Sequence, residues 1–204
     1  MDIALVESAS TSTPKEQTKK EQILQGALEI FLQQGYEGTS MDRVAIAAGV
    51  SKITIYKHFQ DKEGLFTALI TRVTAQKFQR VIGTLSLEDP PAVVLRQVAT
   101  NLLDVLAVDE SYVTFLRLMI GESGRFPALA QLYVEALPKR VWQVLADYFE
   151  AHPELEQKNS EATARIFTGT LISYALTQRL LHGQAIAPMN SEVLVNSLIE
   201  LIVR

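Results

Sequence analysis

The sequence predicts an all-α protein in two parts: a three-helix N-terminal domain containing a helix-turn-helix, followed by a larger all-helical domain. Three observations support this fold class. Apolar residues recur at helical spacing along most of the chain, alternating Val/Ile/Thr-rich runs are scarce, and 204 residues include only seven prolines and ten glycines. This length is sufficient for a sizeable core in one or two domains.

The N-terminal helices are short and are separated by residues that begin or end helices. Apolar residues over about 16–34 follow helical spacing, and Gly35 is a plausible residue at which that helix ends. Thr39 or Ser40 can cap the next helix, "MDRVAIAA", because a side-chain oxygen there accepts an otherwise unpaired backbone N–H. Ser51 can cap a third helix, "KITIYKHF", in the same way.

The turn "AAGVS" joins the second and third helices. Two helices separated by three or four residues, with glycine in the turn, form a helix-turn-helix. Gly49 suits a position that requires a positive φ, which glycine adopts at no steric cost. So tight a turn presents the third helix as an exposed ridge. Asp61 then caps a fourth helix, from Lys62 to about Ile82.

Five further helices are predicted beyond residue 82, which gives about nine in total. Pro138 falls inside the middle one and should kink or split it, because proline lacks the N–H and clashes with the preceding turn. Their expected ranges are 91–107, 110–123, 127–150, 160–182 and 191–203.

Composition excludes several classes of site. Apolar residues make up 48 % of the chain and charged residues 21 %, as in ordinary globular proteins. The chain has no cysteine, which excludes disulfides, thiolate metal sites and cysteine nucleophiles. The three histidines lie far apart, and we expect no cofactor or metal. The first residues lack the basic flank of a signal peptide, and no apolar run approaches a membrane span, so we expect a cytoplasmic protein without a membrane partner.

The third helix carries residue types that suit double-stranded DNA. A helix fits the major groove, where lysine donates to guanine, threonine donates or accepts, and apolar groups touch the thymine methyl. Tyrosine, serine, threonine and lysine also donate to phosphates. The net charge of −4 does not oppose this reading, because residues 15–80 hold ten Lys/Arg and seven Asp/Glu and are mildly basic, whereas the rest of the chain is acidic.

The stretch "GYEGTSMDRVAIAAGVSKITIYKHFQDKEGLF" resembles the DNA-binding domain of TetR-type transcriptional regulators. The resemblance runs from about Lys20 to Leu69. A second segment, "GESGRFPALAQLYVEA", is similar to a region of the regulators of efflux and quorum-sensing genes. The resemblance implies a homodimer on a palindromic operator, with a C-terminal domain that dimerises through its last two helices and binds a small effector. Ligand binding would then move the fourth helix and change the spacing of the recognition helices.

Carried onto this sequence, the resemblance implies two sets of DNA contacts. Ile53 departs from the family pattern, since many members have glycine there, and its bulk must either touch the groove or push the helix outward. The expected base or groove contacts are Lys52, Ile53, Thr54 and Lys57, and the expected phosphate contacts are Thr39, Ser40, Tyr56, His58 and Lys62.

An effector pocket is expected in the C-terminal part, where aromatic residues occupy helical positions. Any one of them could instead belong to the core. Ligand sites are mostly apolar with a few placed polar groups, which brings an arginine and a glutamate into the set. The candidates are Phe78, Tyr112, Phe115, Arg117, Met119, Glu122, Trp142, Phe167 and Tyr174.

The last two predicted helices have apolar faces wider than one core stripe. Such faces favour a helix-bundle dimer interface, although packing within one subunit would also use them. Small residues at i, i+4 and i+8 would let another helix approach closely. The expected interface residues are Gly169, Ser173, Thr177, Leu194, Leu198 and Leu201.

We therefore expect a dimeric, ligand-responsive transcriptional regulator, most simply a repressor, and not an enzyme. No H-E-x-x-H, P-loop or dinucleotide-binding motif is present, and "GESGR" falls short of a nucleophile elbow. The alternative is an activator or constitutive regulator whose C-terminal domain binds a protein rather than a small ligand. The expected organisation is a disordered tail over 1–15, a DNA-binding domain over 16–62, and an effector-binding and dimerisation domain over 63–204.

Overall fold

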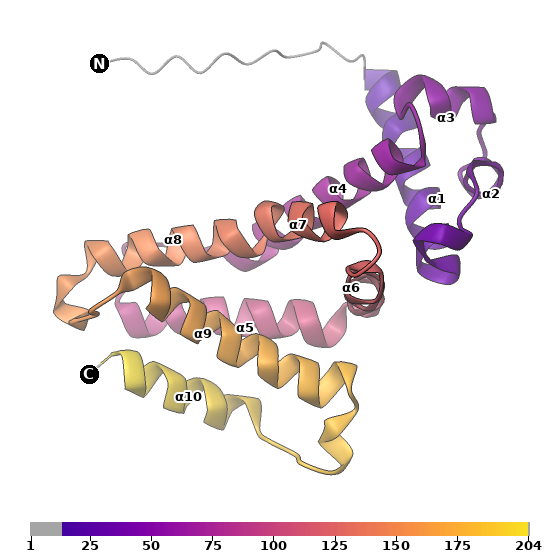
Figure 1. Ribbon diagram of the computed structural model, residues 1–204. Coiled ribbons are helices and arrows are strands. Elements are labelled where there is room, and N and C mark those ends of the chain that lie inside the picture. Colours follow the sequence, from indigo (N-terminus) through magenta and orange to yellow (C-terminus); the bar gives the residue numbers. More distant parts are fainter. Residues whose placement is uncertain (1–13, 204) are drawn as a thin grey trace, which may run out of the picture. The chain divides into compact units, whose positions relative to one another are not determined.

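A computed structural model describes the backbone of residues 14–203 and side chains from residue 18 to 203. The described residues form helices joined by short connections and divide into two compact units, one ending at Leu69 and the other beginning at Ile70 (Figure 1). The boundary falls inside one helix, α4, so this helix contributes residues to both units. The predicted all-α fold with an N-terminal helix-turn-helix is confirmed.

The helices follow one another with short connections. Three short segments of other helical type, η1 (Pro153–Leu155), η2 (Leu176–Leu180) and η3 (Gly183–Ala185), lie between the last helices. The α-helices are α1 (Pro14–Gly38), α2 (Met41–Ala47), α3 (Lys52–His58), α4 (Lys62–Ile82), α5 (Pro91–Val108), α6 (Glu110–Glu122), α7 (Pro127–Ala136), α8 (Pro138–Ala151), α9 (Ser160–Ala175) and α10 (Ser191–Ile202).

Aromatic rings form the core of the N-terminal unit. The ring of Phe66 on α4 lies 4.6 Å from that of Phe31 and 5.0 Å from that of Tyr36, both on α1, between ring centroids. Gly35 interrupts α1 at φ 74°, where the sequence predicted the end of this helix. The interruption separates Phe31 from Tyr36, yet both rings remain buried against α4.

The turn between α2 and α3 is held against α1. Gly49 adopts φ 60°, as predicted for this turn. The Gln22 side chain on α1 donates to the Ala48 carbonyl over 2.7 Å, which satisfies a carbonyl at the end of α2. Gly26 lies so close that an added Cβ would be 2.7 Å from the Ala48 nitrogen. A residue without a side chain therefore permits this contact.

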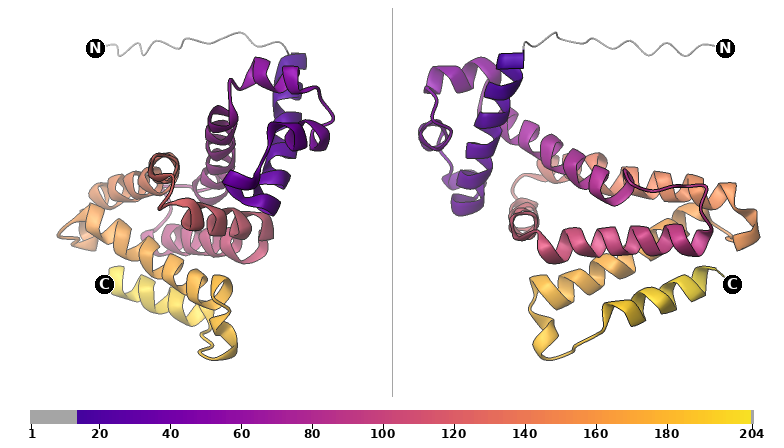
Figure 2. Two further views of the ribbon diagram at one scale, coloured as in Figure 1. Left: turned by 45° about the vertical axis from the view of Figure 1, so that its right-hand side comes forward. Right: turned by 180° about the vertical axis from the view of Figure 1, so that it is seen from behind.

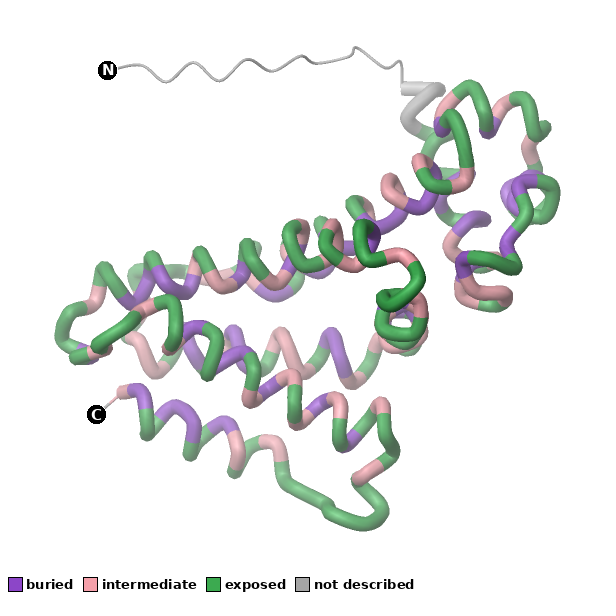
Figure 3. The backbone as a smooth tube through the Cα atoms, in the orientation of Figure 1, coloured by how far each residue is buried: buried purple, intermediate pink, exposed green. Residues whose placement is uncertain are grey.

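The C-terminal unit is a bundle around α5 and α9. Helix α5 packs against α6, α9 and α10, and α8 packs against both α7 and α9. Figures 1 and 2 show α9 between α8 and α10. Buried residues run along one side of α10 and exposed residues along the other (Figure 3).

Pro138 splits the predicted helix 127–150 in two. It is the first residue of α8, the position where the missing N–H costs least, and α7 ends two residues earlier. The predicted helix 160–182 is α-helical only to Ala175 and continues as a π-helical turn, η2, in which the Leu181 N–H donates to the Leu176 carbonyl over 2.9 Å.

Two further predictions concern the N-terminal tail and the absence of a membrane-spanning segment. Most of the predicted tail, 1–15, lies outside the described residues. Helix α5 is long and apolar enough to cross a membrane by length and composition, which differs from the expectation that no segment would be. A core helix meets the same criteria, and α5 packs against three other helices.

Candidate nucleic-acid interface and apolar cavity

Helix α3 is anchored at its start and along its inner face. The Ser51 hydroxyl accepts from the Thr54 N–H over 3.1 Å and shares a hydrogen bond of 2.7 Å with the Thr54 hydroxyl. Ile55 is fully buried against the rest of the N-terminal unit. These contacts fix α3, so its opposite face is turned to solvent.

The exposed face of α3 carries both apolar and polar groups. Ile53 is 82 % exposed and Tyr56 is 44 % exposed, and Lys57 is also exposed. An isoleucine so open to water has no packing role in this unit. This face therefore offers a methyl-bearing side chain, a phenol and an ammonium group to a groove.

Lys52 connects this face to α2. Its ammonium group lies 2.9 Å from the carboxylate of Asp42, and this hydrogen bond raises the pKa of Lys52. Both side chains are exposed, so the ion pair is screened by water and contributes little to stability. A base or phosphate that binds Lys52 would therefore have to compete with Asp42.

Two of the expected phosphate contacts, Thr39 and Lys62, are engaged inside the unit. The Thr39 hydroxyl is buried, with the residue 3 % exposed, and donates to the Gly35 carbonyl over 2.7 Å. The Lys62 ammonium donates to the carbonyls of Glu37 and Thr39 over 3.1 and 3.2 Å. Both side chains satisfy carbonyls around the end of α1. The buried Thr39 hydroxyl is not presented to phosphate, which corrects that expectation. Lys62 is half-buried, and its phosphate contact, which would require it to leave these carbonyls, stays a prediction.

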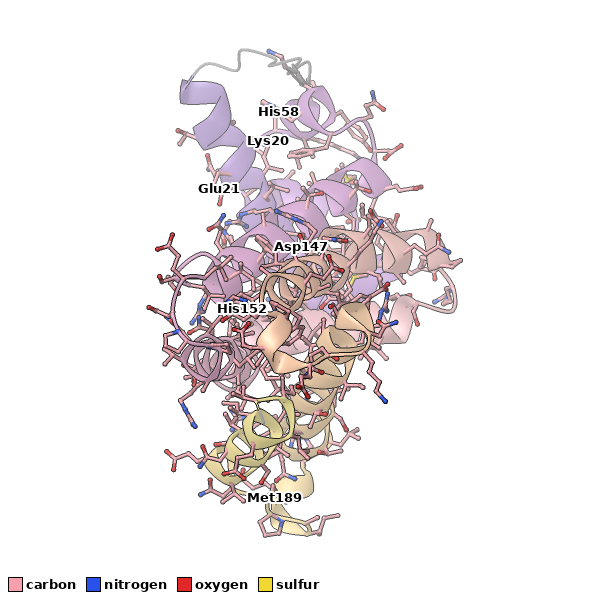
Figure 4. All side chains as sticks on the ribbon, turned by 90° about the vertical axis from the view of Figure 1, so that its left-hand side faces the viewer. Lys20, Glu21, His58, Asp147, His152 and Met189 are labelled. Carbon is pink, nitrogen blue, oxygen red and sulfur yellow. The ribbon has the colours of Figure 1, made fainter. Side chains whose placement is uncertain are left out.

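The remaining expected phosphate contacts lie at helix ends. Ser40 is exposed and caps α2, accepting from the Arg43 N–H over 3.4 Å. His58 is half-buried at the end of α3, and Lys20 on α1 lies 5.9 Å above the ring of the neighbouring Phe59 (Figure 4). The end of α3 therefore has a cation from another helix nearby, a contact that sequence spacing did not reveal.

The C-terminal unit contains a cavity of about 280 Å³. Its walls come from α4 to α9 and from η2, and they are almost entirely apolar. The lining residues are Lys77, Val81, Leu102, Val105, Leu106, Tyr112, Val113, Leu116, Ile120, Tyr133, Val134, Leu137, Pro138, Val141, Trp142, Thr168, Ile172, Ala175, Leu176, Arg179 and Leu180. A volume of this size approaches that of small-molecule sites.

Polar groups of the cavity wall are hydrogen-bonded in pairs. The hydroxyls of Tyr112 and Tyr133 lie 2.8 Å apart, and the Trp142 indole N–H donates to the Thr168 hydroxyl over 3.0 Å. The Lys77 ammonium forms a short ion pair with Asp109. The cavity is therefore apolar with a few fixed polar points, the usual composition of a ligand site.

Asp109 joins α4 to the start of α6. Its carboxylate accepts from the Ser111 hydroxyl over 2.6 Å and from the Tyr112 N–H over 3.0 Å, in addition to Lys77. Burial alone would raise the pKa of Asp109, but these hydrogen bonds to the ionised form outweigh it and lower the pKa to about 2. Asp109 therefore stays charged and holds Lys77 in place at neutral pH.

Comparison with known families agrees with this geometry. Residues 23–69 match the family described as bacterial regulatory proteins, tetR family, and residues 93–204 match the AefR-like transcriptional repressor C-terminal domain. The second match alone covers more than half of the chain. The chain belongs to the TetR family.

Solved structures and curated relatives extend this assignment to TetR-family transcriptional regulators. A putative TetR-family regulator from Mesorhizobium loti MAFF303099 superposes with a TM-score of 0.78 at 27 % identity, over 94 % of this chain and 98 % of that one. The flavonoid-responsive regulator FrrA superposes with a TM-score of 0.70 at 30 % identity, over 90 % and 92 %. The regulator YvkB of Bacillus subtilis, which is uncharacterised, is 25 % identical over 83 % of this chain and 87 % of its own. All three are named as transcriptional regulators or as responsive regulators.

The cavity includes few of the residues expected to line it. Of nine candidates, only Tyr112 and Trp142 do so, while Arg117 lines an adjoining polar hollow of about 560 Å³, which shares Val113 and Arg179 with the cavity. The other six do not line the cavity, which corrects their assignment: Phe115, Met119 and Phe167 are buried in the core, and Glu122 lies outside the cavity. The Phe78 ring centre lies 4.1 Å from the Arg140 guanidinium carbon, and the Tyr174 hydroxyl donates to the Met189 carbonyl over 2.9 Å. Helical spacing shows which residues face inward, but not which of them border an empty space.

Lys77 and Tyr133 line the cavity but were not among the residues predicted from the sequence. Lys77 could have been noticed as a cation on the inward face of a helix, since such a residue must be paired when buried. Tyr133 gave no comparable signal, because its partner Tyr112 is on a different helix and their contact depends on tertiary packing.

The residues expected at a dimer interface divide into two groups. Gly169 and Ser173 lie on the exposed side of α9, Thr177 is exposed on η2, and Leu201 on α10 is 63 % exposed. Leu194 is half-buried, whereas Leu198 is 5 % exposed and packs inside the subunit, so we correct its assignment to the interface. The exposed residues Gly169 and Ser173 therefore form a solvent-facing surface of small side chains on α9.

Proposed function

We propose that this protein is a dimeric TetR-family repressor that leaves a palindromic operator when a small apolar or aromatic effector occupies the cavity. The observation that supports this most directly is the presence, in one chain, of an exposed helix-turn-helix face and of an apolar cavity of about 280 Å³. The name of FrrA, a flavonoid-responsive regulator, is consistent with an aromatic effector for this chain as well.

The proposed DNA contacts are on exposed or half-buried side chains. Lys52, Ile53 and Lys57 on α3 would reach base edges together with Thr54, and specificity would come from this helix and from half-site spacing. Tyr56, Ser40 and His58 would contact phosphates, which supply most of the affinity and fix the register of α3.

Dimerisation would place two recognition helices on one face of the DNA. Half-sites of helix-turn-helix dimers lie about 34–36 Å apart, or at multiples of that distance. The exposed small residues of α9 suit a helix-bundle interface, because a Cβ built on Gly169 would have no atom within 4 Å. An effector would act by favouring a dimer whose spacing does not match the operator. Such a regulator would work in the cytoplasm.

The alternative, a C-terminal domain that binds a protein instead of a small ligand, predicts a solidly packed core. The apolar cavity therefore favours an effector.

The DNA-binding part is tested by fluorescence anisotropy with labelled DNA from upstream of the protein's own gene, using a scrambled duplex as competitor across a salt series. We expect binding that survives the competitor and weakens as salt rises. If neither this duplex nor any duplex enriched by a genome-wide pull-down is preferred over the scrambled one, the proposed regulatory function is wrong.

A further inference from the structure

The polar corner of the cavity, formed by Lys77, Tyr112 and Tyr133, differs from the rest of its wall. Lys77 and Tyr112 are 7 % and 4 % exposed, and the Lys77 ammonium lies 5.0 Å from the centre of the Tyr112 ring. The other polar wall groups are already hydrogen-bonded. The Trp142 N–H donates to Thr168, whose hydroxyl donates in turn to the Ala164 carbonyl over 2.8 Å.

The tyrosine pair has one hydroxyl proton to spare. In a hydrogen bond between two hydroxyls, one proton is shared and the other remains available for a further acceptor. Burial raises the pKa of Tyr133, and burial, Tyr133 and Asp109 together raise that of Tyr112, so both hydroxyls stay protonated at neutral pH. Within the described part of the chain, no other hydrogen bond uses this proton.

The corner also has an excess of positive charge. Asp109 is paired with Lys77 and lies 3.6 Å from the Arg80 guanidinium, so two cations share one carboxylate. Of these three, only Lys77 lines the cavity, and the lining residues among those described include no aspartate or glutamate. A ligand cation would therefore be buried beside a cation without a compensating anion, which is costly.

We propose that the cavity selects an apolar, aromatic-sized molecule with one weakly acidic oxygen, of which a phenol is the simplest case, and rejects cations. The ligand oxygen would accept the spare proton of the Tyr112–Tyr133 pair while its apolar body fills the remainder of the cavity. This proposal rests on the proposed effector cavity and names the chemical class that the cavity recognises.

Three probes with the same butylphenyl body test this selection. They are 4-butylphenol, its near-isostere 4-butyltoluene, in which a methyl replaces the hydroxyl, and the cationic 4-butylbenzylamine. Trp142 is the only tryptophan of the chain and lines the cavity, so its emission, excited at the red edge of its absorption band where the probes do not absorb, reports occupancy.

The wild-type protein is expected to bind 4-butylphenol at least as tightly as 4-butyltoluene, and at least about tenfold more tightly than the amine. The double variant Tyr112→Phe/Tyr133→Phe should reverse the first preference, favouring the toluene by about fivefold or more, because the phenol hydroxyl would be buried without a partner. Each single variant keeps one hydroxyl, which is then free for the ligand, and should retain the wild-type preference within about threefold.

Tyr148→Phe is the matched control. It also removes a buried tyrosine hydroxyl, which donates to the Asp89 carbonyl over 3.2 Å, but Tyr148 does not line the cavity. This variant should retain the wild-type preference.

Tighter binding of the toluene or of the amine than of the phenol by the wild-type protein would overturn this inference and leave the effector cavity standing. Binding of none of the probes would overturn both. Selective binding of the phenol without any effect on DNA would contradict only the proposed regulation.

Discussion

Single residues decide how tightly the helix-turn-helix packs on α1. Gly26 is the clearest case, because an added Cβ would lie 2.7 to 2.9 Å from three atoms of Ala48. We predict that Gly26→Ala lowers the free energy of unfolding by roughly 1–3 kcal/mol through overpacking, despite the better helix propensity of alanine. Urea unfolding followed by circular dichroism measures this. Gly121→Ala on α6 is the control, since a Cβ there meets no atom within 4 Å and should be neutral or slightly stabilising. An equal gain from both would contradict the close contact.

Asp109 should make stability depend on pH. Its pKa of about 2 in the folded protein lies below the ordinary value near 3.9, so its contribution is present above about pH 4 and is lost as the pH falls toward 2. Asp109→Asn removes the charge and should cost roughly 1.5–3 kcal/mol at pH 7, the range for hydrogen bonds to charged groups. The difference between wild type and variant, measured by urea unfolding, should shrink as the pH falls from 4 toward 2. A constant difference across this range would show that the charge has no role.

At the scale of the element, α3 should separate affinity from specificity. Tyr56→Phe removes one phosphate donor and should weaken binding to all duplexes by roughly two- to tenfold, without a change in base preference. Lys52→Ala should relax preference at particular base pairs by roughly 1–3 kcal/mol. Anisotropy titrations against an operator and its single-base variants distinguish the two. If Lys52→Ala left base preference unchanged, the proposed docking of α3 would be wrong.

Helix α9 provides the test of dimerisation. We predict that Gly169→Leu weakens the proposed dimer at least about tenfold, because a bulky side chain would separate two helices packed at the proposed small-residue interface. The subunit itself should fold normally, since a Cβ at this position meets nothing within 4 Å. Sedimentation velocity across a dilution series measures the effect. Gly121→Leu, a substitution at another open helical glycine, should leave association unchanged, and a dimer unaffected by Gly169→Leu would place the interface elsewhere.

Comparison of the predicted with the observed helices shows which features the sequence was sufficient to predict. Local signals predicted the helix-turn-helix, since the caps at Ser40 and Ser51 and the positive φ of Gly49 depend on neighbouring residues only. Tertiary packing decided the rest. The hydrogen bond of Lys62 to the Glu37 carbonyl joins residues 25 positions apart in the chain. The cavity exists because side chains from six helices leave a space between them. The helical periodicity of the sequence gives no information about that space.

At the scale of the whole molecule, α4 is the covalent link between the two units. Residues up to Leu69 belong to the N-terminal unit, and Lys77, on the same helix, lines the cavity of the other unit. The short ion pair between Lys77 and Asp109 ties this part of α4 to α6. A ligand that draws Lys77 away from Asp109 would therefore act on the helix that continues into the DNA-binding unit. Its effect on DNA would be limited by its differential affinity for the two forms.

The most direct test of the proposed regulation measures occupancy of the cavity and binding of DNA together in one sample. A phenol that changes Trp142 emission is titrated into the complex of the protein with a labelled operator, and anisotropy of the label is recorded at each step. We expect loss of DNA and occupancy of the cavity to rise over the same range of ligand concentration. A cavity that saturates while the operator stays bound would contradict this expectation, as would release of DNA without any change in Trp142.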